Sequence, residues 1–203
     1  MKLVAFDFGT NSLRMQVAVR DGDRLQPVAS RLDACRIGRG LRQTGKLSSA
    51  GCERALATLR VWLAECARDG ITPVGGIATE AVRRAADGAA FLDRVRRETG
   101  LAVELIDGAR EAELTWRGVT AALPGLPEPV AIIDIGGGST EIIVSTPAGQ
   151  TVVSLPIGSV VATEDHIRQD PPTEAELAAV ADAAEQLVAP HAAPDAALVG
   201  VGG

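Results

Sequence analysis

Aromatic side chains are nearly absent from this sequence of 203 residues. Phe, Trp and Tyr together make up 2% of the chain, and Tyr does not occur. The hydrophobic core must therefore be built from aliphatic side chains. Proteins that bind single-stranded nucleic acid stack its bases on exposed aromatic rings, and this chain has only three Phe and two Trp. We expect no nucleic-acid partner.

Cysteine and histidine are also rare, with three Cys and two His. Cys35, Cys52 and Cys66 form no Cys-x-x-Cys pattern, so no structural zinc site is expected. Cys52 and Cys66 fall on one predicted helix, roughly 21 Å apart at 1.5 Å per residue, which is too far for a disulfide. Free thiols are typical of a reducing compartment.

No segment has the pattern of export or membrane insertion. The N-terminus has one Lys, four apolar residues and then Asp7, unlike a signal peptide. One uncharged run, residues 142–163, is long enough to span a bilayer. Because it contains Pro147, Pro156 and two glycines, a strand–turn–strand is the better interpretation. We expect a cytoplasmic protein without a membrane partner.

Basic residues are almost missing from the C-terminal part. Up to Leu123 there are 19 basic and 15 acidic residues, whereas the rest has one basic residue, Arg168, and 11 acidic ones. Opposite charges suggest two domains, of which only the first would attract a polyanion. Three prolines in residues 124–129 mark the linker. We therefore expect domains at residues 1–125 and 126–203.

Strands alternate with helices along the chain, which predicts an α/β fold. The predicted strands are residues 2–8, 14–19, 24–30, 73–78, 101–106, 130–135, 140–145, 151–157 and 196–201, and the predicted helices are 51–68, 89–99, 109–123 and 173–188. Thr173 and Glu176 form a capping-box pattern at the last helix. The order strand, Asp-x-Gly turn, strand, turn, strand occurs twice, 127 residues apart, which indicates a duplicated domain.

The second copy of this pattern carries the clearer chemistry. Its candidate residues are Asp134, Gly136, Gly137, Gly138, Ser139, Thr140 and Glu141. Three glycines allow a tight turn whose amide groups form an anion-binding concavity, and two hydroxyls add donors. Carboxylates beside a phosphate site usually hold Mg²⁺. The alternative is a glycine-rich hairpin without a ligand.

The first copy has fewer glycines but similar chemical types. Its candidate phosphate-binding residues are Asp7, Gly9, Thr10, Asn11, Ser12 and Arg14. Asn11 tolerates a left-handed backbone, and Arg14 can bind phosphate oxygens. Alone, the stretch is typical of a polar hairpin turn. Facing a second such loop, it would form half of a phosphate site.

Six motifs, in this order, resemble the exopolyphosphatase/guanosine pentaphosphate phosphohydrolase family. They are Asp7-x-Gly-x-Asn-Ser-x-Arg14, Ala78-Thr-x-Ala-Val-Arg83, Gly108-x-x-Glu-Ala112, Asp134-Ile-Gly-Gly-Gly-Ser-Thr-Glu141, Leu155-Pro-Ile-Gly-Ser159 and Gly200-Val-Gly-Gly203. The resemblance covers essentially the whole chain. It implies a duplicated ribonuclease H-like fold with mixed sheets, shared with actin, chaperone ATPases and sugar kinases.

The resemblance also implies two catalytic residues. Glu111 corresponds to the general base for the attacking water, and Arg83 to a phosphate-binding arginine. The sequence alone predicts a solvated helix glutamate at position 111 and does not separate Arg83 from Arg84. Glu80 departs from the family pattern, which often has a small or amide residue there.

Further roles are implied for the acidic residues and for a third loop. Asp134, Glu141 and Asp7 correspond to residues linked to Mg²⁺, and Gly158 with Ser159 to a loop that contacts phosphate. In the family the final glycine motif runs into a further helix, so we expect the chain to be truncated within its second domain.

A basic stretch lies between the first repeat and the first long helix. Its members are Arg31, Arg36, Arg39, Arg42 and Lys46, against Asp33 as the only acid. A polyphosphate chain could enter along it. The alternative is a solvated loop.

The function implied by the resemblance is Mg²⁺-dependent hydrolysis of a terminal phosphoanhydride. The substrate would be inorganic polyphosphate or guanosine pentaphosphate, with release of orthophosphate. One alternative is a non-catalytic sensor of these ligands or an inactive fragment, and another is a phosphotransferase of the same superfamily. The oligomeric state is open, with a homodimer as one candidate.

Overall fold

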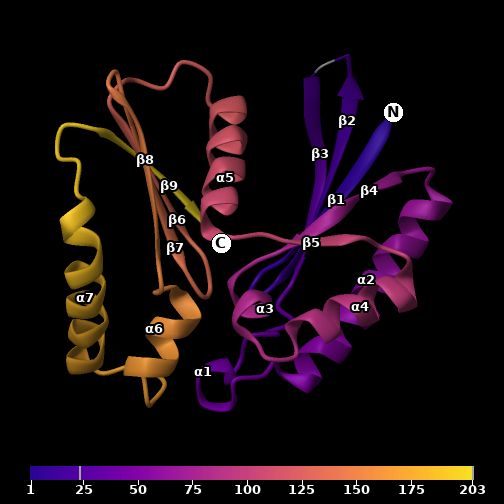
Figure 1. Cartoon of the computed structure of the whole chain (residues 1–203), viewed down its shortest axis with the longest axis horizontal. Helices are drawn as coiled ribbons and strands as arrows, with labels where there is room; N and C mark the ends of the chain where they lie inside the picture. The colour runs from indigo at the N-terminus through magenta and orange to yellow at the C-terminus, as the bar shows by residue number, and fades with distance from the viewer. Residues whose placement is uncertain (23, 203) are drawn as a thin grey trace. The chain divides into compact units, whose positions relative to one another are not determined.

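The computed structural model describes residues 1–22 and 24–202, so Gly203 of the last motif lies outside the described part. The chain forms two compact units, Met1–Ile106 and Asp107–Gly203. Each unit is one sheet with helices packed against it (Figure 1). No helix among the described residues has the length and apolar character needed to cross a membrane.

The sheet of the first unit has five strands in the order β3-β2-β1-β4-β5. Their bounds are Lys2–Phe8 (β1), Leu13–Asp21 (β2), Arg24–Asp33 (β3), Thr72–Ala78 (β4) and Val103–Leu105 (β5). The first three strands are antiparallel neighbours, and β4 pairs in parallel with β1. The sheet is therefore mixed, as expected.

Helices of the first unit cover one face of this sheet. They are Leu41–Thr44 (α1), Ser49–Arg68 (α2), Glu80–Arg84 (α3) and Gly88–Thr99 (α4). Alternate residues of β1, namely Val4, Phe6 and Phe8, are buried with α2 residues such as Leu56 and Leu59. Because side chains alternate across a strand, Asp7 lies on the opposite face.

The three cysteines are free and buried. Cys52 and Cys66 both lie on α2, as expected. Burial raises the pKa of Cys35 and of Cys52 to about 11. At neutral pH these two thiols are protonated, so they act as core side chains rather than nucleophiles.

The sheet of the second unit repeats the first four strands in the order β8-β7-β6-β9. The elements are Gly108–Ala122 (α5), Val130–Ile135 (β6), Thr140–Thr146 (β7), Gly149–Leu155 (β8), Ser159–His166 (α6), Glu174–Val188 (α7), Ala189–His191 (η1) and Ala197–Gly202 (β9). The predicted capping box at α7 is confirmed, with Thr173 and Glu176 bonding each other's backbone amides.

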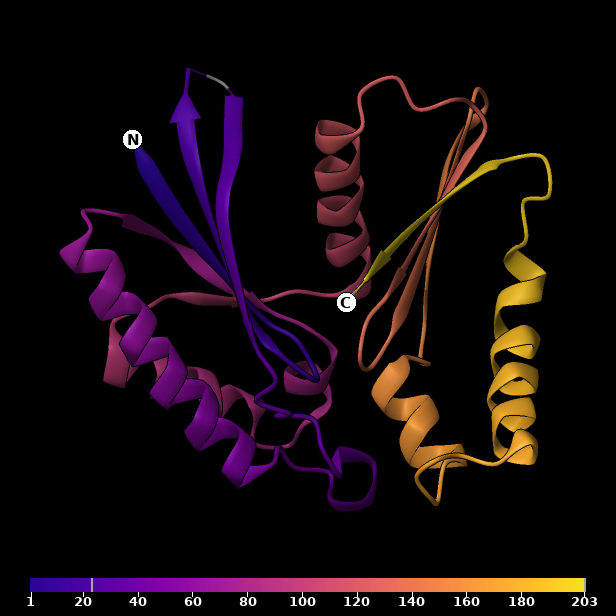
Figure 2. The same cartoon turned by 180° about the vertical axis from the view of Figure 1, so that it is seen from behind.

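Helices α5 and α7 lie on opposite faces of this second sheet (Figure 2). Ile132 and Ile143 pack with Ala112 and Val119 of α5. Ile142 of the next position along β7 packs instead in a cluster that includes α7 residues. Because successive side chains of a strand point to opposite faces, the side chains of β6 and β7 face α5 and α7 in turn.

The unit boundary corrects the expected division at residues 125 and 126. The two units separate between Ile106 and Asp107, so α5 and Glu111 belong to the second unit. The physical reason is the apolar face of α5, which is buried against β6 and β7. The proline-rich residues 124–129 connect α5 to β6 inside that unit.

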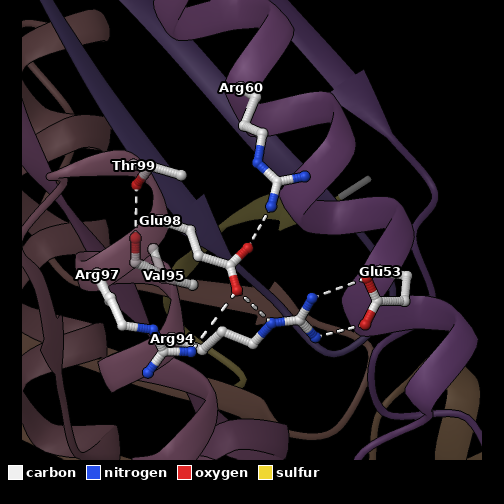
Figure 3. A network of polar contacts seen from close by, with 7 residues as sticks. All are labelled: Glu53, Arg60, Arg94, Val95, Arg97, Glu98 and Thr99. Carbon is white, nitrogen blue, oxygen red and sulfur yellow. Dashed lines mark hydrogen bonds and ion pairs between the residues drawn. The ribbon is translucent and has the colours of Figure 1, made fainter.

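Ion pairs join α2 to α4 on the surface of the first unit (Figure 3). Arg94 donates to both carboxylate oxygens of Glu53, with Nη2–Oε2 at 2.8 Å, and its Nε lies 2.7 Å from Glu98 Oε1. Arg60 of α2 also pairs with Glu98. Arg94 is thus the cation shared by both carboxylates.

We expect Arg94→Gln to lower the melting temperature in a pH-dependent way. Hydrogen bonds from Arg94 lower the pKa of Glu53 and Glu98 from 4.5. Groups with lowered pKa values stabilise the fold fully above the unfolded-state pKa and lose this effect as pH falls through the folded-state value. The deficit at pH 7 should therefore shrink below pH 4.5 in thermal unfolding measured by circular dichroism.

The control is Arg96→Gln on the same helix, because Arg96 is exposed and forms no ion pair among the described residues. It should leave the melting temperature nearly unchanged at both pH values. A deficit for Arg94→Gln that persists at pH 3 would contradict the electrostatic assignment.

Candidate active site

The glycine turn of the first unit, loop 1, comprises residues 9–12. Its ends are joined by a hydrogen bond from Gly9 N to Ser12 O at 3.0 Å. The flanking strands pair so that Asp7 lies directly opposite Arg14. Asp7 and Arg14 therefore share one face of the sheet beside the loop. Asp7 Oδ1 is a buried oxygen.

The glycine turn of the second unit, loop 2, comprises residues 136–139 and has the same construction. Gly136 N donates to Ser139 O at 3.0 Å. Asp134 lies directly opposite Glu141 in the β6–β7 register. The predicted repeat is therefore present in detail, down to one turn hydrogen bond and one cross-strand pair.

Backbone carbonyls of both loops are bonded within their own unit. Thr10 O and Asn11 O accept from Gly38 N at 2.9 Å and Arg36 N at 2.8 Å. In loop 2, Gly136 O and Gly137 O accept from the amides of residues 159 and 160, both at 2.9 Å. These bonds occupy the carbonyls of Thr10, Asn11, Gly136 and Gly137, which leaves the amides of Asn11 and Gly137 as candidate donors to a ligand. Amide donors in a tight turn are what an anion requires.

Three predicted phosphate-binding residues have contacts that support loop 2. Thr140 is buried, and its hydroxyl donates to Ile157 O at 2.6 Å. Ser159 donates its amide to Gly136 O. A Cβ at Gly158 would lie 2.6 Å from Gly136 O and from Gly137 O, so only glycine allows this close approach. Together they hold loop 2 in place from within the unit.

A row of polar side chains crosses the second sheet beside loop 2. Ser154, Glu141 and Asp134 are consecutive cross-strand partners on β8, β7 and β6. They therefore lie on one face. This is the α5 face, because Ile132 and Ile143, two positions away, pack against α5. Glu141 is only 1% exposed, and Ser154 Oγ donates to its Oε1 at 2.6 Å.

Helix α5 contributes the remaining carboxylate to this face. Thr115 Oγ1 donates to Asp134 Oδ2 at 2.7 Å. A Cβ on Gly108 would lie 2.6 Å from the Cβ of Ser154, so the first turn of α5 contacts the other end of the row. Glu111 lies between these two contacts at helical spacing, three residues after Gly108 and four before Thr115, and hence on the same face. Its Oε2 is buried.

Glu113, two residues further along α5, has a more exposed environment than the buried Oε2 of Glu111. It is 42% exposed and pairs with Arg110 at 2.5 Å and with Arg117 at 2.6 Å. The hydrogen bond from Arg110 lowers the pKa of Glu113. The structure therefore separates a solvated glutamate from Glu111, which the sequence alone could not do.

Arg83 follows β4 on the short helix α3. Thr79 N donates to Phe8 O at 3.3 Å, so α3 begins beside the end of β1, where loop 1 starts. Arg83 Nη1 donates to Ile106 O at 2.6 Å, and its guanidinium also pairs with Glu80. Arg84 is more exposed and lies 3.5 Å from Glu80. Arg83 is thus the arginine held in a fixed position.

An open groove of about 570 Å³ adjoins loop 2. Ile135, Ser159, Gly200, Val201 and Gly202 line it. Strands β6 and β9 run in parallel here, and the groove lies at their carboxyl ends. Ligands of open α/β sheets bind at this edge.

The donor set fits a hard cation that keeps most of its own water. Among residues 1–22 and 24–202, no group of three or more His, Cys, Asp or Glu could hold a metal ion. Asp134 and Glu141 provide two carboxylates on one face. Mg²⁺ is typically bound by one or two carboxylates together with waters and substrate phosphates.

A family model matches residues 16–200, and it describes the Ppx/GppA phosphatase family. The chain belongs to this family. Exopolyphosphatase 2 of Mycobacterium tuberculosis is 31% identical over 87% of the chain and 58% of the relative. The chain therefore spans somewhat more than half the length of that relative.

Solved structures of relatives agree with the fold. The Ppx/GppA family member of Aquifex aeolicus is 33% identical and superposes with a TM-score of 0.78, covering the whole chain and 66% of the solved one. An exopolyphosphatase from Cytophaga hutchinsonii is 28% identical with a TM-score of 0.84, over 94% and 62%. The expected duplicated ribonuclease H-like α/β fold is confirmed.

Sequence reasoning missed two hydroxyls and one glycine of the site. Ser154 could have been found by extending the register of the predicted hairpin across from Glu141. Thr115 gave no signal, because its bond to Asp134 depends on how α5 packs. The sequence also contained no sign that Gly38 must be a glycine, although a Cβ at this position would lie 2.4 Å from Thr10 Cγ2.

We expect Gly108→Ala to destabilise the protein by about 1–3 kcal/mol. The new methyl group would lie 2.7 Å from Ser154 Oγ and displace the donor from the buried Glu141. Gly118→Ala on the same helix is the control, because nothing lies within 4 Å of its Cβ position. It should stabilise by about 0.5–1 kcal/mol. Equal unfolding free energies for both variants in urea would contradict the contact.

Proposed function

We propose that this chain carries the hydrolytic site of an exopolyphosphatase, which releases orthophosphate from the end of inorganic polyphosphate. The observation that supports this proposal most directly is the row of carboxylates beside loop 2, with Glu111 on the same face of the sheet. The names of the relatives support polyphosphate rather than guanosine pentaphosphate as the substrate.

The two loops would bind the phosphate oxygens. Thr10, Asn11, Gly136 and Gly137 have their carbonyls bonded inside the protein, and the amides of residues such as Asn11 and Gly137 can donate to an anion. Phosphoryl transfer spreads negative charge over the phosphoryl oxygens in its transition state. Fixed amide donors stabilise such charge without reorganising at the moment of reaction.

Glu111 would act as the general base. It occupies the first turn of α5, where the helix macrodipole favours a carboxylate. The buried position of its Oε2 limits competition from bulk solvent. A carboxylate so placed can hold a water molecule and accept its proton as the water attacks phosphorus.

Asp134 and Glu141 would hold Mg²⁺, and Asp7 is the corresponding carboxylate in the repeat of the first unit. When bound, the cation would offset phosphate charge. Thr115 and Ser154 fix the two β6 and β7 carboxylates through hydrogen bonds of 2.7 and 2.6 Å. Such outer partners orient metal-binding carboxylates.

A second candidate function is a sensor that binds polyphosphate without hydrolysing it. The observation in its favour is the ion pair between Arg83 and Glu80, because a carboxylate already occupies the guanidinium that would bind phosphate. Hydrolysis and binding assays distinguish the two candidates.

We expect Glu111→Gln to reduce phosphate release by about 10²- to 10⁴-fold, since the amide cannot accept the proton from water. Release from long-chain polyphosphate and from guanosine pentaphosphate would be measured with and without Mg²⁺. Glu113→Gln is the matched control, because the side chain of Glu113 on the same helix is 42% exposed. The rate of phosphate release by Glu113→Gln should stay within about twofold of the wild-type rate.

Three outcomes bear directly on the proposal. Metal-dependent release that Glu111→Gln abolishes supports hydrolysis, and the faster substrate identifies the preference. Release unaffected by the substitution overturns the base assignment. Ligand-induced stabilisation without release favours the sensor.

We expect Glu80→Gln to tighten binding of tripolyphosphate by about threefold to fivefold. Removing the charge frees the Arg83 guanidinium, and an ion pair of this kind is worth about 1 kcal/mol or less. Glu65→Gln removes a comparable pair with Arg31 and is the control. Weaker binding in calorimetry would mean that Glu80 positions Arg83 instead of competing for it.

A further inference from the structure

The basic segment, residues 36–46, contains four cations and no acidic residue. Arg36, Arg39, Arg42 and Lys46 are all exposed, and no acidic residue occurs between Asp33 and Glu53. The fifth cation expected in this stretch, Arg31, lies instead on β3 and pairs with Glu65. The stretch is therefore not one uniform loop.

Most other arginines of the first unit are paired with carboxylates. These are Arg31, Arg54, Arg60, Arg68, Arg83, Arg84, Arg94 and Arg97. Within the described residues, Arg36, Arg39 and Lys46 form no such pair. Their charge is thus available to an external anion.

The basic segment is fastened directly to loop 1. Arg36 N donates to Asn11 O at 2.8 Å, and Gly38 N to Thr10 O at 2.9 Å. A Cβ on Gly38 would meet both Thr10 and Ala81 of α3, so this glycine lies between loop 1 and the helix that carries Arg83. The exposed cations therefore begin where the proposed phosphate site ends.

The far end of the segment is fixed as well. Gly45 O accepts from Ala86 N at 2.9 Å, and the amide of Leu47 donates to Asp87 Oδ1 at 2.9 Å. Arg36 itself has φ of 57°, a left-handed conformation that is uncommon for a residue with a Cβ. The surrounding bonds hold this conformation, and such outliers concentrate at functional sites.

We propose that the basic segment is a second anion subsite, which binds phosphates of a polyphosphate chain beyond the terminal one at loop 1. This inference rests on the proposed function and adds a determinant of substrate length. Each bound internal phosphate would exchange the water around an exposed cation for an anion on a fixed backbone. A substrate with few phosphates could not reach the segment and would gain nothing from it.

Polyphosphate fits the segment better than a nucleotide. The apolar side chains Ile37 and Leu47 are buried, and the exposed charged residues are all cations. No aromatic ring occurs in residues 36–46 to stack on a base. The first unit has 17 basic and 12 acidic residues, so its overall field also favours a polyanion.

The test is the double variant Arg39→Gln/Lys46→Gln, with binding measured by calorimetry on the full chain. Two unit charges 4 Å apart in water interact enough to change affinity about fivefold, so the double variant should bind long-chain polyphosphate about 25-fold more weakly. Tripolyphosphate affinity should stay within about twofold. The loss should diminish at 1 M salt, where exposed charges are screened.

The matched control is Arg24→Gln/Arg96→Gln, which removes the same charge from two exposed arginines elsewhere on the unit. An equal loss in this control would overturn the proposal, because net charge alone would then explain it. Equal weakening toward tripolyphosphate would also overturn it. Binding of an RNA oligonucleotide as tight as that of polyphosphate would overturn the ligand assignment.

Binding is measured separately from hydrolysis, so the two proposals can fail independently. If the wild-type chain binds long-chain polyphosphate with the expected dependence on Arg39 and Lys46 but releases no phosphate, the subsite stands and the hydrolase does not. If phosphate is released and the double variant leaves the KM for every chain length unchanged, the subsite fails and the hydrolase stands.

Discussion

The register of two antiparallel hairpins determines where the candidate chemistry lies. In each unit the second-to-last residue of the first strand is an aspartate, and it lies directly opposite a charged residue at the second position of the next strand. A shift of one residue would move the charged pair to the other face and bury it among apolar side chains. The turn hydrogen bonds from Gly9 and Gly136 hold the register at the loops.

Helix α5 depends on that register and in turn completes the site. Its apolar residues Ala112 and Val119 fit the face that displays Ile132 and Ile143. The same packing brings Thr115 to Asp134 and places Glu111 on the face of the carboxylate row. An apolar contact, which has little directional preference of its own, thereby places a residue whose proposed function requires a defined direction.

Local patterns in the sequence were sufficient for the long elements and for the repeat. Strands with alternating residues, the 20-residue helix α2 and the cap at Thr173 were all predicted because their signals lie within a few residues. The motif that resembles the family also supplied Glu111 and Arg83. Helices α1, α3 and α6 were missed, since four to eight residues carry too little periodicity.

Contacts between distant segments could not be predicted in this way. The unit boundary was expected at the prolines near residue 125, but the packing of α5 places it after Ile106. The choice between Arg83 and Arg84 depends on the carbonyl of Ile106, 23 residues away in sequence. Likewise, nothing near Gly38 indicates that it must approach Thr10.

Duplication followed by a change of charge fits the proposed chemistry. Arg14 in the first unit and Glu141 in the second occupy the same place in the repeat, each opposite an aspartate. The difference extends beyond this pair, because the first unit is rich in arginine and the second has three basic and 14 acidic residues.

A phosphoanhydride hydrolase needs cations for a polyanionic substrate and carboxylates for water and Mg²⁺. If one sheet had to carry both sets, the opposite charges would pair with each other, as Arg83 and Glu80 do. Dividing them between two copies of one fold places an excess of cations in one unit and an excess of carboxylates in the other.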